Sequence, residues 1–470
     1  MKKQRSINIW LSLVPIVVVI VLGLMSVTTW GAGMNIPLLS SIVAAALVGI
    51  WLGIPWEELQ KSLVHGVARA LPAIFILIIV GSIVGTWILS GIIPTLIYYS
   101  LKVINPVIFI PACMVVTAII ATATGTSFTS IATIGIALMA TGQGMGFPAP
   151  LVAGAIISGA YFGDSFSPLS DTTNLASAMS GCTLFELIGH MVWTSLPGLI
   201  ISCIIFYFLG LPYSGASAAN TETIRVITGG LESAFRISPL LLLVPVITIV
   251  LSIMRVPSLP TLLCVSVLGG LAGMVFQGAS IGAVIVAMTR GFSSSTGIQM
   301  LDSLLTRGGI NSMSNTVVML SMATALGGIL ERIGALDSIL TKAMKRVHSN
   351  GALVSVTALS GLVVAFATGA QLLAIMLPAR MFSGEYAKRN LHAKNLGRVA
   401  QSIGAVAINL VPWSVPAIFA ANMLGVEAIL FIPYVIFAYV ILILNVLYGF
   451  IGFTIAPADQ TSKTETPAVK

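Results

Sequence analysis

Long apolar segments, each about as long as a lipid bilayer is thick, recur along this chain of 470 residues and restrict the folds open to it. A helix needs roughly 17 to 25 mostly apolar residues to cross the hydrocarbon core. Windows of this kind lie at 9–30, 36–54, 71–89, 106–123, 191–211, 237–254 and 429–455. Hydrophobic residues make up 57% of the chain and charged residues only 8%. The sequence therefore predicts an all-α polytopic membrane protein, with about 10 to 12 transmembrane helices by this length rule.

The charged residues orient the chain rather than mark a nucleic-acid partner. The net charge is +8, but the basic residues lie mostly between apolar windows, and no basic stripe carries interleaved aromatics. One polar segment, 380–398, holds five of them: Arg380, Lys388, Arg389, Lys394 and Arg398. The positive-inside rule places this segment and the N-terminus in the cytoplasm. An even number of crossings would bring the C-terminus to the same side.

The chain aligns with itself at a nearly constant offset. ATATG at 121–125 matches AFATG at 365–369, an offset of 244 residues, and the same offset aligns 167–181 with 411–425. An offset of 243 aligns several glycines further upstream. We therefore expect two structural repeats with interrupted helices or re-entrant hairpins. Whether these repeats are inverted or parallel is left open by hydropathy.

The expected organisation has five parts. An N-terminal transmembrane helix covers 1–35, and its long apolar run does not resemble a cleaved signal peptide. The repeats cover 36–211 and 259–455, a connecting segment with one transmembrane helix covers 212–258, and a disordered cytoplasmic tail covers 456–470. Such repeats are typical of secondary transporters, whose substrates bind near the membrane midplane at interrupted helices.

Other classes of function find less support. The four cysteines are isolated and lack metal-site spacing, so we expect neither a structural metal nor a cofactor. Paired histidine ligands, a nucleophile elbow and a phosphate-binding loop are missing from the sequence, which argues against a membrane enzyme. A channel is disfavoured by the repeats, and single-channel currents would decide that question.

The segment GDSFSPLSDTTN, residues 163–174, is the strongest candidate site. It holds two of only 14 acidic residues, Asp164 and Asp171, within an apolar stretch. An ionised Asp at the bilayer centre costs roughly 2.5 to 3.5 kcal/mol. Pro168 should break the helix and free the carbonyl of Asp164. We expect both aspartates to bind a transported Na⁺ or a proton, because hard cations prefer oxygen ligands. Five neutral neighbours would add ligands: Ser167, Ser170, Thr172, Thr173 and Asn174.

The matching segment of the second half is neutral, since Ile408 and Val415 align with the two aspartates. Helix breaks are expected at Pro412 and Pro416, and at glycines in both halves. The amides of half-helices at such breaks would face an anion or a carboxylate. The candidate residues of this substrate cavity are Thr124, Gly125, Thr126, Ser127, Thr368, Gly369, Gln371, Asn409, Trp413 and Ser414. The alternative is that SPLSD merely caps a helix and that the glycine breaks serve packing.

Residues 163–174 resemble the signature of the NhaC family of Na⁺/H⁺ antiporters, which reads GD, two variable residues, then SPLSDTTN. Further blocks look like the family in family order, among them RGGINSM at 307–313, GGILERIGALDSIL at 327–340 and LPARMFSGEYAKRNLHAKNLGR at 377–398. The resemblance implies a prokaryotic carrier in the cytoplasmic membrane that exchanges Na⁺ for H⁺ without a cofactor. Its partners would be these two ions and lipid, with a homodimer left open.

The chain departs from the family at one place. After Arg398 the family commonly has a Glu-Asp pair, whereas this chain has Gln401 and Ser402. Later, the family's Pro-Trp-Asn is replaced by Pro412, Trp413 and Ser414. This difference bears on the ion stoichiometry. It keeps open a second function, an H⁺- or Na⁺-coupled carrier or exchanger of a small organic acid or amino acid, like malate/lactate-type relatives.

Overall fold

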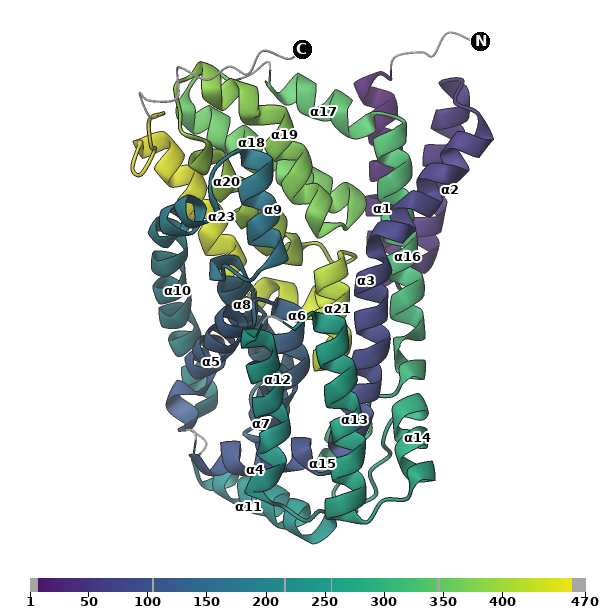
Figure 1. Ribbon diagram of the computed structural model, residues 1–470, viewed down its shortest axis with the longest axis vertical. Coiled ribbons are helices and arrows are strands. Elements are labelled where there is room, and N and C mark those ends of the chain that lie inside the picture. The colour runs from purple at the N-terminus through teal and green to yellow at the C-terminus, as the bar shows by residue number, and fades with distance from the viewer. Residues whose placement is uncertain (1–6, 104, 215–216, 255, 345–346, 459–470) are drawn as a thin grey trace.

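The computed structural model describes residues 7–458, apart from 104, 215–216, 255 and 345–346. The described residues form helices and no strand, with only two isolated β-bridges, Phe292 to Arg307 and Leu391 to Pro457. The predicted all-α class is confirmed. Figure 1 shows α4 (Ile92–Val103), α11 (Ser217–Ala234) and α15 (Gln299–Leu305) at one end of the molecule, with α17 (Ala335–Met344) and α19 (Gln371–Lys388) toward the other.

The remaining helices of the first half span the predicted N-terminal helix, the first repeat and part of the connecting segment. They are α1 (Ile9–Thr28), α2 (Asn35–Trp51), α3 (Trp56–Leu89), α5 (Phe109–Thr124), α6 (Ser127–Ser130), α7 (Ile136–Gly144), α8 (Ala149–Phe166), α9 (Asp171–Ser180), α10 (Leu184–Ser214) and α12 (Leu243–Ile253). A π-helix, η2 (Ile131–Gly135), joins α6 to α7, and 3-10 turns lie at η1 (Pro106–Ile108) and η3 (Pro239–Leu242).

The second half holds the remaining described elements. They are α13 (Ser258–Gln277), α14 (Ile281–Arg290), α16 (Ser314–Arg332), α18 (Asn350–Thr368), α20 (Ala393–Gln401), α21 (Val415–Leu424), α22 (Ala428–Phe431) and α23 (Ile436–Ile451). A second π-helix, η5 (Ser402–Val406), directly continues α20. The 3-10 turns are η4 (Ile310–Met313), η6 (Ala407–Leu410) and η7 (Ile432–Tyr434).

Seven of the described helices are long and apolar enough to cross a membrane. Three further pairs pass this test only together, and they bend by 94°, 48° and 52° at a short break; counting each pair as one span gives ten. The expected 10 to 12 spans are thus reached at their lower end through broken helices. One bent pair, 225–234 with 239–248, lies in the predicted connecting segment.

Element boundaries in the two halves fall at the offsets read from the sequence. Helix α5 ends at Thr124 and α18 at Thr368, 244 residues later. Helices α9 and α21 begin and end at the same offset, and each is followed by a left-handed glycine, Gly181 or Gly425. These matches support the two-repeat organisation, which stays a prediction, as do the boundaries of the five parts.

Two glycines stop helices at the breaks that the sequence marks. Gly125 ends α5 with φ 71°, and Gly369 ends α18 with φ 62°. Glycine adopts this left-handed conformation without the steric cost of a Cβ. A Cβ on Gly125 would lie 2.5 Å from the Cβ of Leu169, and one on Gly369 would lie 2.9 Å from the carbonyl oxygen of Trp413. In both halves, therefore, the glycine break packs against the linker before α9 or α21.

Glycines also let α8 approach its neighbours closely. A Cβ on Gly159 would lie 2.1 Å from the carbonyl oxygen of Met114 in α5, and one on Gly163 would lie 2.3 Å from that of Ala118. Small residues at a helix contact allow backbones to pack directly, which is the usual solution inside membranes. This packing holds the C-terminal half of α8, which carries Asp164, against α5.

The polar segment 380–398 differs from the expected loop. Helix α19 continues to Lys388 and α20 starts at Ala393, so only four residues separate them. Arg398 lies within α20 and is 0% exposed. From the charge pattern we expected Arg398 to be exposed to solvent. The sequence does not show that the residues from Asn395 to Gln401 are all buried by neighbouring helices.

The predicted disordered tail begins at 456, yet 456–458 are ordered by backbone contacts. The His392 amide donates to the Ala456 carbonyl, and the Ala458 amide donates to the Asn390 carbonyl. Residues 1–6 and 459–470 lie outside the described residues, so the predicted location of the two termini is untested.

Substituting Gly159 with Ala should destabilise the protein by about 1 to 3 kcal/mol, because the added methyl overpacks the contact with α5. Thermal unfolding of the purified protein in detergent would show this as a lower Tm. Gly189→Ala is the matched control, since a Cβ there meets nothing within 4 Å in α10. Equal Tm values for the two variants would contradict the close α5 to α8 packing.

Asp302 organises the connection between α14 and α16. Its carboxylate accepts from the Thr296 amide and hydroxyl and the Ser294 hydroxyl at 2.7 to 2.8 Å, and from the Gly297 amide at 3.0 Å. These bonds, the Thr296 amide foremost, hold the pKa of Asp302 below its ordinary value. A lowered folded pKa contributes stability above the unfolded pKa of about 3.9, and this stability is lost as the pH falls through the folded value.

Asp302→Asn should therefore speed amide exchange in residues 293–298 at neutral pH, because Asn accepts these bonds less well. The difference from the unmodified protein should shrink as the pH falls through the lowered pKa of folded Asp302, where the carboxylate is protonated. Hydrogen exchange followed by mass spectrometry measures both. A difference that stays constant down to low pH would contradict the assigned role of the carboxylate.

Candidate functional site

The linker between α8 and α9 frees a backbone carbonyl beside a carboxylate. Helix α8 ends at Phe166, Ser167 is extended, and Pro168 has no amide hydrogen to continue the helix. The Asp164 carbonyl accepts instead from the Ser167 amide at 3.2 Å and from the Thr173 hydroxyl at 3.3 Å. The Ser170 hydroxyl caps α9 by accepting from the Thr173 amide. Asp164 is thus fixed at a helix end rather than along a regular span.

The Asp164 carboxylate is buried and 6% exposed. Ser127, the first residue of α6, donates its hydroxyl to Oδ2 at 2.7 Å. The Gly125 break, two residues before Ser127, directs α6 toward α8. Among the described residues, no basic side chain forms an ion pair with Asp164. The helix break at Gly125 and the end of α8 therefore lie next to each other, and Asp164, which has no basic partner among the described residues, lies between them.

Two further residues complete this site. Tyr161, one turn before Asp164, is 1% exposed and interacts electrostatically with Ser127 and Asp164. Gln401 at the end of α20 is 0% exposed and donates its amide to the hydroxyls of Thr172 at 3.0 Å and Thr173 at 3.1 Å. We call Ser127, Tyr161, Asp164, Thr173 and Gln401 the Asp164 cluster.

Sequence reasoning named neither Tyr161 nor Gln401 as a site residue. The spacing of Tyr161 from Asp164 places both on one face of α8 and was a usable signal. Gln401 is one of few amide side chains in a long apolar stretch. Its contact with 172–173 spans more than 220 residues, so only the fold could reveal it.

Three side-chain oxygens of α8 and α20 are buried and form no hydrogen bond with the described residues. They are the Tyr161 and Ser165 hydroxyls and Gln401 Oε1. Most buried polar atoms in folded proteins have a partner, so such a group requires an explanation. Neutral oxygens beside one carboxylate form a donor set suited to a small hard cation.

Asp171 differs from Asp164, because the structure exposes Asp171 and buries Asp164, and its role in ion binding stays a prediction. It occupies the first turn of α9, where the helix N-terminus favours a carboxylate. Asn174 is exposed too, and its amide donates to the carbonyls of Pro168 and Ser170. The two aspartates interact electrostatically but do not share a buried pocket.

The other hydroxyls of the segment serve mainly the linker. Ser167, 0% exposed, accepts from the Leu169 amide at 3.2 Å. The hydroxyls of Ser170 and Thr172 lie 2.9 Å apart. Ser170 also interacts with the Asp164 carboxylate. These contacts place Ser170 and Thr172 next to the Asp164 cluster. The Ser167 hydroxyl contacts the backbone of the linker instead.

The helix break in the second half has no charged side chain, and its polar side chains donate mostly to backbone carbonyls. Ser414 donates to the Ile408 carbonyl at 3.0 Å and caps α21, Trp413 donates to the Phe366 carbonyl at 2.8 Å, and Asn409 donates to the Val406 carbonyl at 3.0 Å. Only Oδ1 of Asn409 lacks a hydrogen bond with the described residues in this set.

The two prolines of this break act differently. Pro412 lies in the linker between η6 and α21. Pro416 is in the first turn of α21, where a missing amide hydrogen breaks no helical bond, so the predicted break at Pro416 needs correction. The helix axis turns by 48° before this point, between 393–410 and 415–424.

The remaining cavity candidates line the glycine breaks. Thr124 lies 3.3 Å from the Ser130 hydroxyl, and its own hydroxyl is 3.4 Å from the carbonyl of Thr126. In the other half, Thr368 donates to Val364 within α18, and Gln371 donates to the Ala405 carbonyl at 3.2 Å. These contacts stabilise the breaks.

An aromatic stack joins the two halves. The rings of Phe128 in α6 and Phe419 in α21 are stacked with centroids 4.4 Å apart. The half-helices α6 and α21 are therefore neighbours, and the neutral break lies close to the charged one.

Comparison with known proteins agrees with this architecture. A model of the Na⁺/H⁺ antiporter family matches residues 159–453, a range that contains Asp164 and both linkers. The chain belongs to this family. It is 34% identical to the Na⁺/H⁺ antiporter NhaC of Alkalihalophilus pseudofirmus, over 96% of this chain and 97% of the relative. It is 36% identical to NhaC of Bacillus subtilis, over 89% of this chain and 92% of the relative.

A relative named for a different exchange reaction is about equally similar. The malate-2H⁺/Na⁺-lactate antiporter of Bacillus subtilis is 37% identical over 90% of both chains. Among solved structures, Neisseria gonorrhoeae MtrF matches with a TM-score of 0.40 and 14% identity over 84% of each chain, a likeness too low to carry an argument. Family membership identifies a multi-pass membrane transporter rather than an enzyme, and expected membership of the NhaC family is confirmed.

Proposed function

We propose that this protein exchanges Na⁺ for H⁺ across the prokaryotic cytoplasmic membrane, with Asp164 as the site that both ions share. The observation that carries this proposal is the Asp164 cluster: a buried carboxylate without a basic partner among the described residues, surrounded by hydroxyl and amide oxygens. Asp171, the second candidate for Na⁺, takes an auxiliary role at the exposed edge.

The physical basis is competition for one negative charge. A buried carboxylate in a membrane must be neutralised by a proton, a cation or a charged partner. Asp164 has no charged partner among the described residues, so a proton and Na⁺ become alternatives. When the site is open to one side of the membrane, Na⁺ binds to Asp164 and the proton leaves. When it is open to the other side, a proton binds and Na⁺ leaves. The breaks at Gly125 and Pro168 are natural points for such movement.

Family membership and the NhaC relatives support this reading. Both termini are proposed to lie in the cytoplasm, on the basis of the positive-inside pattern. Lipid surrounds the spans, and no cofactor or nucleic acid takes part. A homodimer is left open by this proposal.

Asp164→Asn should lower Na⁺-driven proton movement at least about tenfold, because the neutral amide removes the charge for which the ions compete. Inside-out membrane vesicles with a pH-sensitive dye measure the collapse of a preformed pH gradient on addition of Na⁺. Asp337→Asn is the control for loss of a negative charge elsewhere, since Asp337 is exposed in the first turn of α17 and lies outside the Asp164 cluster. Full exchange by the Asp164 variant, at unchanged protein level, would refute the proposal.

Asp171→Asn separates the two aspartates in the same assay. Because Asp171 is exposed and its charge is screened by salt, we expect exchange to persist with a weaker apparent affinity for Na⁺. Complete loss of exchange in this variant, with Asp164 intact, would assign the essential carboxylate to Asp171 instead.

Gln401→Glu tests the departure from the family. The new carboxylate would stand beside the hydroxyls of Thr172 and Thr173 and add a second negative charge to the Asp164 cluster. We expect a higher apparent affinity for Na⁺ and a steeper dependence of exchange on pH, since two carboxylates would titrate together. An unchanged Na⁺ and pH dependence would mean that position 401 does not contact the ion.

A second function, coupled exchange of a small organic acid, is favoured by one observation. Gln401 and Ser402 are neutral where the family commonly has two acids, so the pocket repels an anion less. The name of the malate-2H⁺/Na⁺-lactate antiporter suggests lactate and malate as the organic acids to test. Uptake of labelled lactate or malate without Na⁺, with no Na⁺-stimulated dye signal, would favour it over Na⁺/H⁺ exchange.

A further inference from the structure

A buried arginine lies three residues before Gln401 without an acidic partner among the described residues. Arg398 in α20 is 0% exposed. One guanidinium nitrogen, Nη1, donates to the Thr454 hydroxyl at 2.7 Å. The other two, Nε and Nη2, form no hydrogen bond with the described residues. A buried charge of this kind is unfavourable unless a counter-charge compensates it.

The two free nitrogens are the pair best suited to one class of ligand. Nε and Nη2 carry parallel N–H groups along one edge of the planar guanidinium. This edge matches the two oxygens of a carboxylate, which it binds through two hydrogen bonds. A spherical anion such as chloride cannot occupy both positions in the same way.

The side chains around Arg398 add donors and no negative charge. His190 in α10 is 7% exposed and interacts electrostatically with Arg398, and its Nε2 has no hydrogen bond with the described residues. Tyr386 in α19 and Tyr448 in α23 also interact with the guanidinium. The surroundings are therefore basic or neutral.

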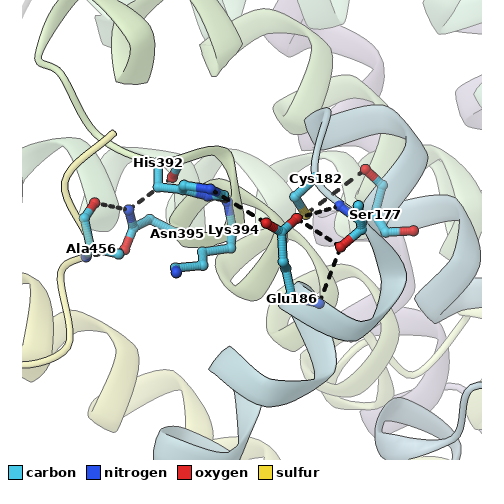
Figure 2. A network of polar contacts seen from close by, with 8 residues as sticks. Ser177, Cys182, Glu186, His392, Lys394, Asn395 and Ala456 are labelled. Carbon is cyan, nitrogen blue, oxygen red and sulfur yellow. Dashed lines mark hydrogen bonds and ion pairs between the residues drawn. The ribbon is translucent and has the colours of Figure 1, made fainter. Parts of the chain in front are cut away.

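Glu186, an acidic residue near His190 at the start of α10, already has hydrogen-bond and ion-pair partners. Glu186 accepts from the Thr183 amide at 2.8 Å and hydroxyl at 2.7 Å at the start of α10. It also lies 3.7 Å from Nε2 of His392, as Figure 2 shows. On the other side of His392, Asn395 and Ala456 hold the C-terminal segment by reciprocal hydrogen bonds of 2.7 and 3.0 Å. Glu186 thus faces His392 and Thr183 and forms no ion pair with Arg398.

A cavity lies beside α19 and α20, and its lining includes Leu396, two residues before Arg398. It has a volume of about 360 Å³ and is lined by Ser180, Ser383, Gly384, Tyr386, Ala387, Leu391, Ala393 and Leu396. Tyr386 both lines the cavity and interacts with Arg398, and its hydroxyl makes only a long 3.4 Å contact with Thr357.

We propose that Arg398 is a binding site for a small carboxylate, held through Nε and Nη2 with His190 beside it. The ligand reaches it from the cavity that Tyr386 borders. This site goes beyond the proposed ion exchange, because binding here requires neither Na⁺ nor Asp164. The two proposals can therefore fail separately.

Thermal unfolding of the purified full-length protein in Na⁺-free detergent buffer tests the site. We expect lactate and malate, added as N-methylglucamine salts, to raise Tm with concentration, since a ligand that binds the native state stabilises it. Methyl lactate, the uncharged ester, should have no effect. Chloride at the same concentration should give at most about a fifth of the carboxylate shift.

Variants locate the effect. Arg398→Lys keeps the charge but loses the two-nitrogen edge, and we expect it to weaken carboxylate binding at least tenfold. Arg398→Gln should abolish it. Lys394→Gln, which removes a neighbouring charge on α20, and Asp164→Asn should both retain the Tm shift of the unmodified protein.

Three outcomes would overturn the proposal: no carboxylate shift in the unmodified protein, an equal shift with chloride, or an undiminished shift in Arg398→Lys. If Arg398→Gln does not fold, Arg398→Lys decides the question. Loss of ion exchange in Asp164→Asn together with a preserved carboxylate shift would support both proposals at once.

Discussion

The hydrogen bond from Ser127 to the buried Asp164 carboxylate is the interaction around which the rest of the structure is arranged. A negative charge inside an apolar helix bundle is unfavourable by roughly 2.5 to 3.5 kcal/mol before any compensation. The chain compensates it without a basic side chain among the described residues. It ends α5 at Gly125 to bring Ser127 close, ends α8 at Phe166 to turn Thr173 back onto the Asp164 carbonyl, and places Gln401 against Thr173.

Helix α20 links this site to the second half. Gln401 contacts the hydroxyls beside Asp164, while Arg398, on the same helix, faces Thr454 and the tyrosines of α19 and α23. The π-helix η5 begins at the next residue, Ser402, and insertions of this kind often accompany functional sites. Any shift of α20 therefore moves both the amide at the acid and the guanidinium near the cavity. This arrangement offers a physical route by which an ion at one site and a carboxylate at the other could affect each other.

The sequence predicted the fold and its breaks well, because the signals for both are local. Apolar window length predicts spans, and Gly125, Gly369 and Pro168 stand where helices end. The burial of Asp164 could be predicted from the scarcity of acids around it. The exposure of Asp171 could not be predicted. The non-helical residues 167–170 separate α9 from α8, so the face on which Asp171 lies depends on how α9 packs. Gln401 and Arg398 were missed as site residues for a similar reason: their surroundings come from α9, α19 and α23, which only the folded chain brings to α20.

Proton release on Na⁺ binding tests the central claim most directly. If one carboxylate binds either ion, Na⁺ added to purified protein in a weakly buffered solution must displace protons, and a pH indicator can count them. The account predicts a release that saturates with Na⁺, approaches one proton per Asp164 at a pH where the site is protonated, and disappears in Asp164→Asn. Saturable Na⁺ binding without proton release, or the same release from Asp164→Asn, would contradict it.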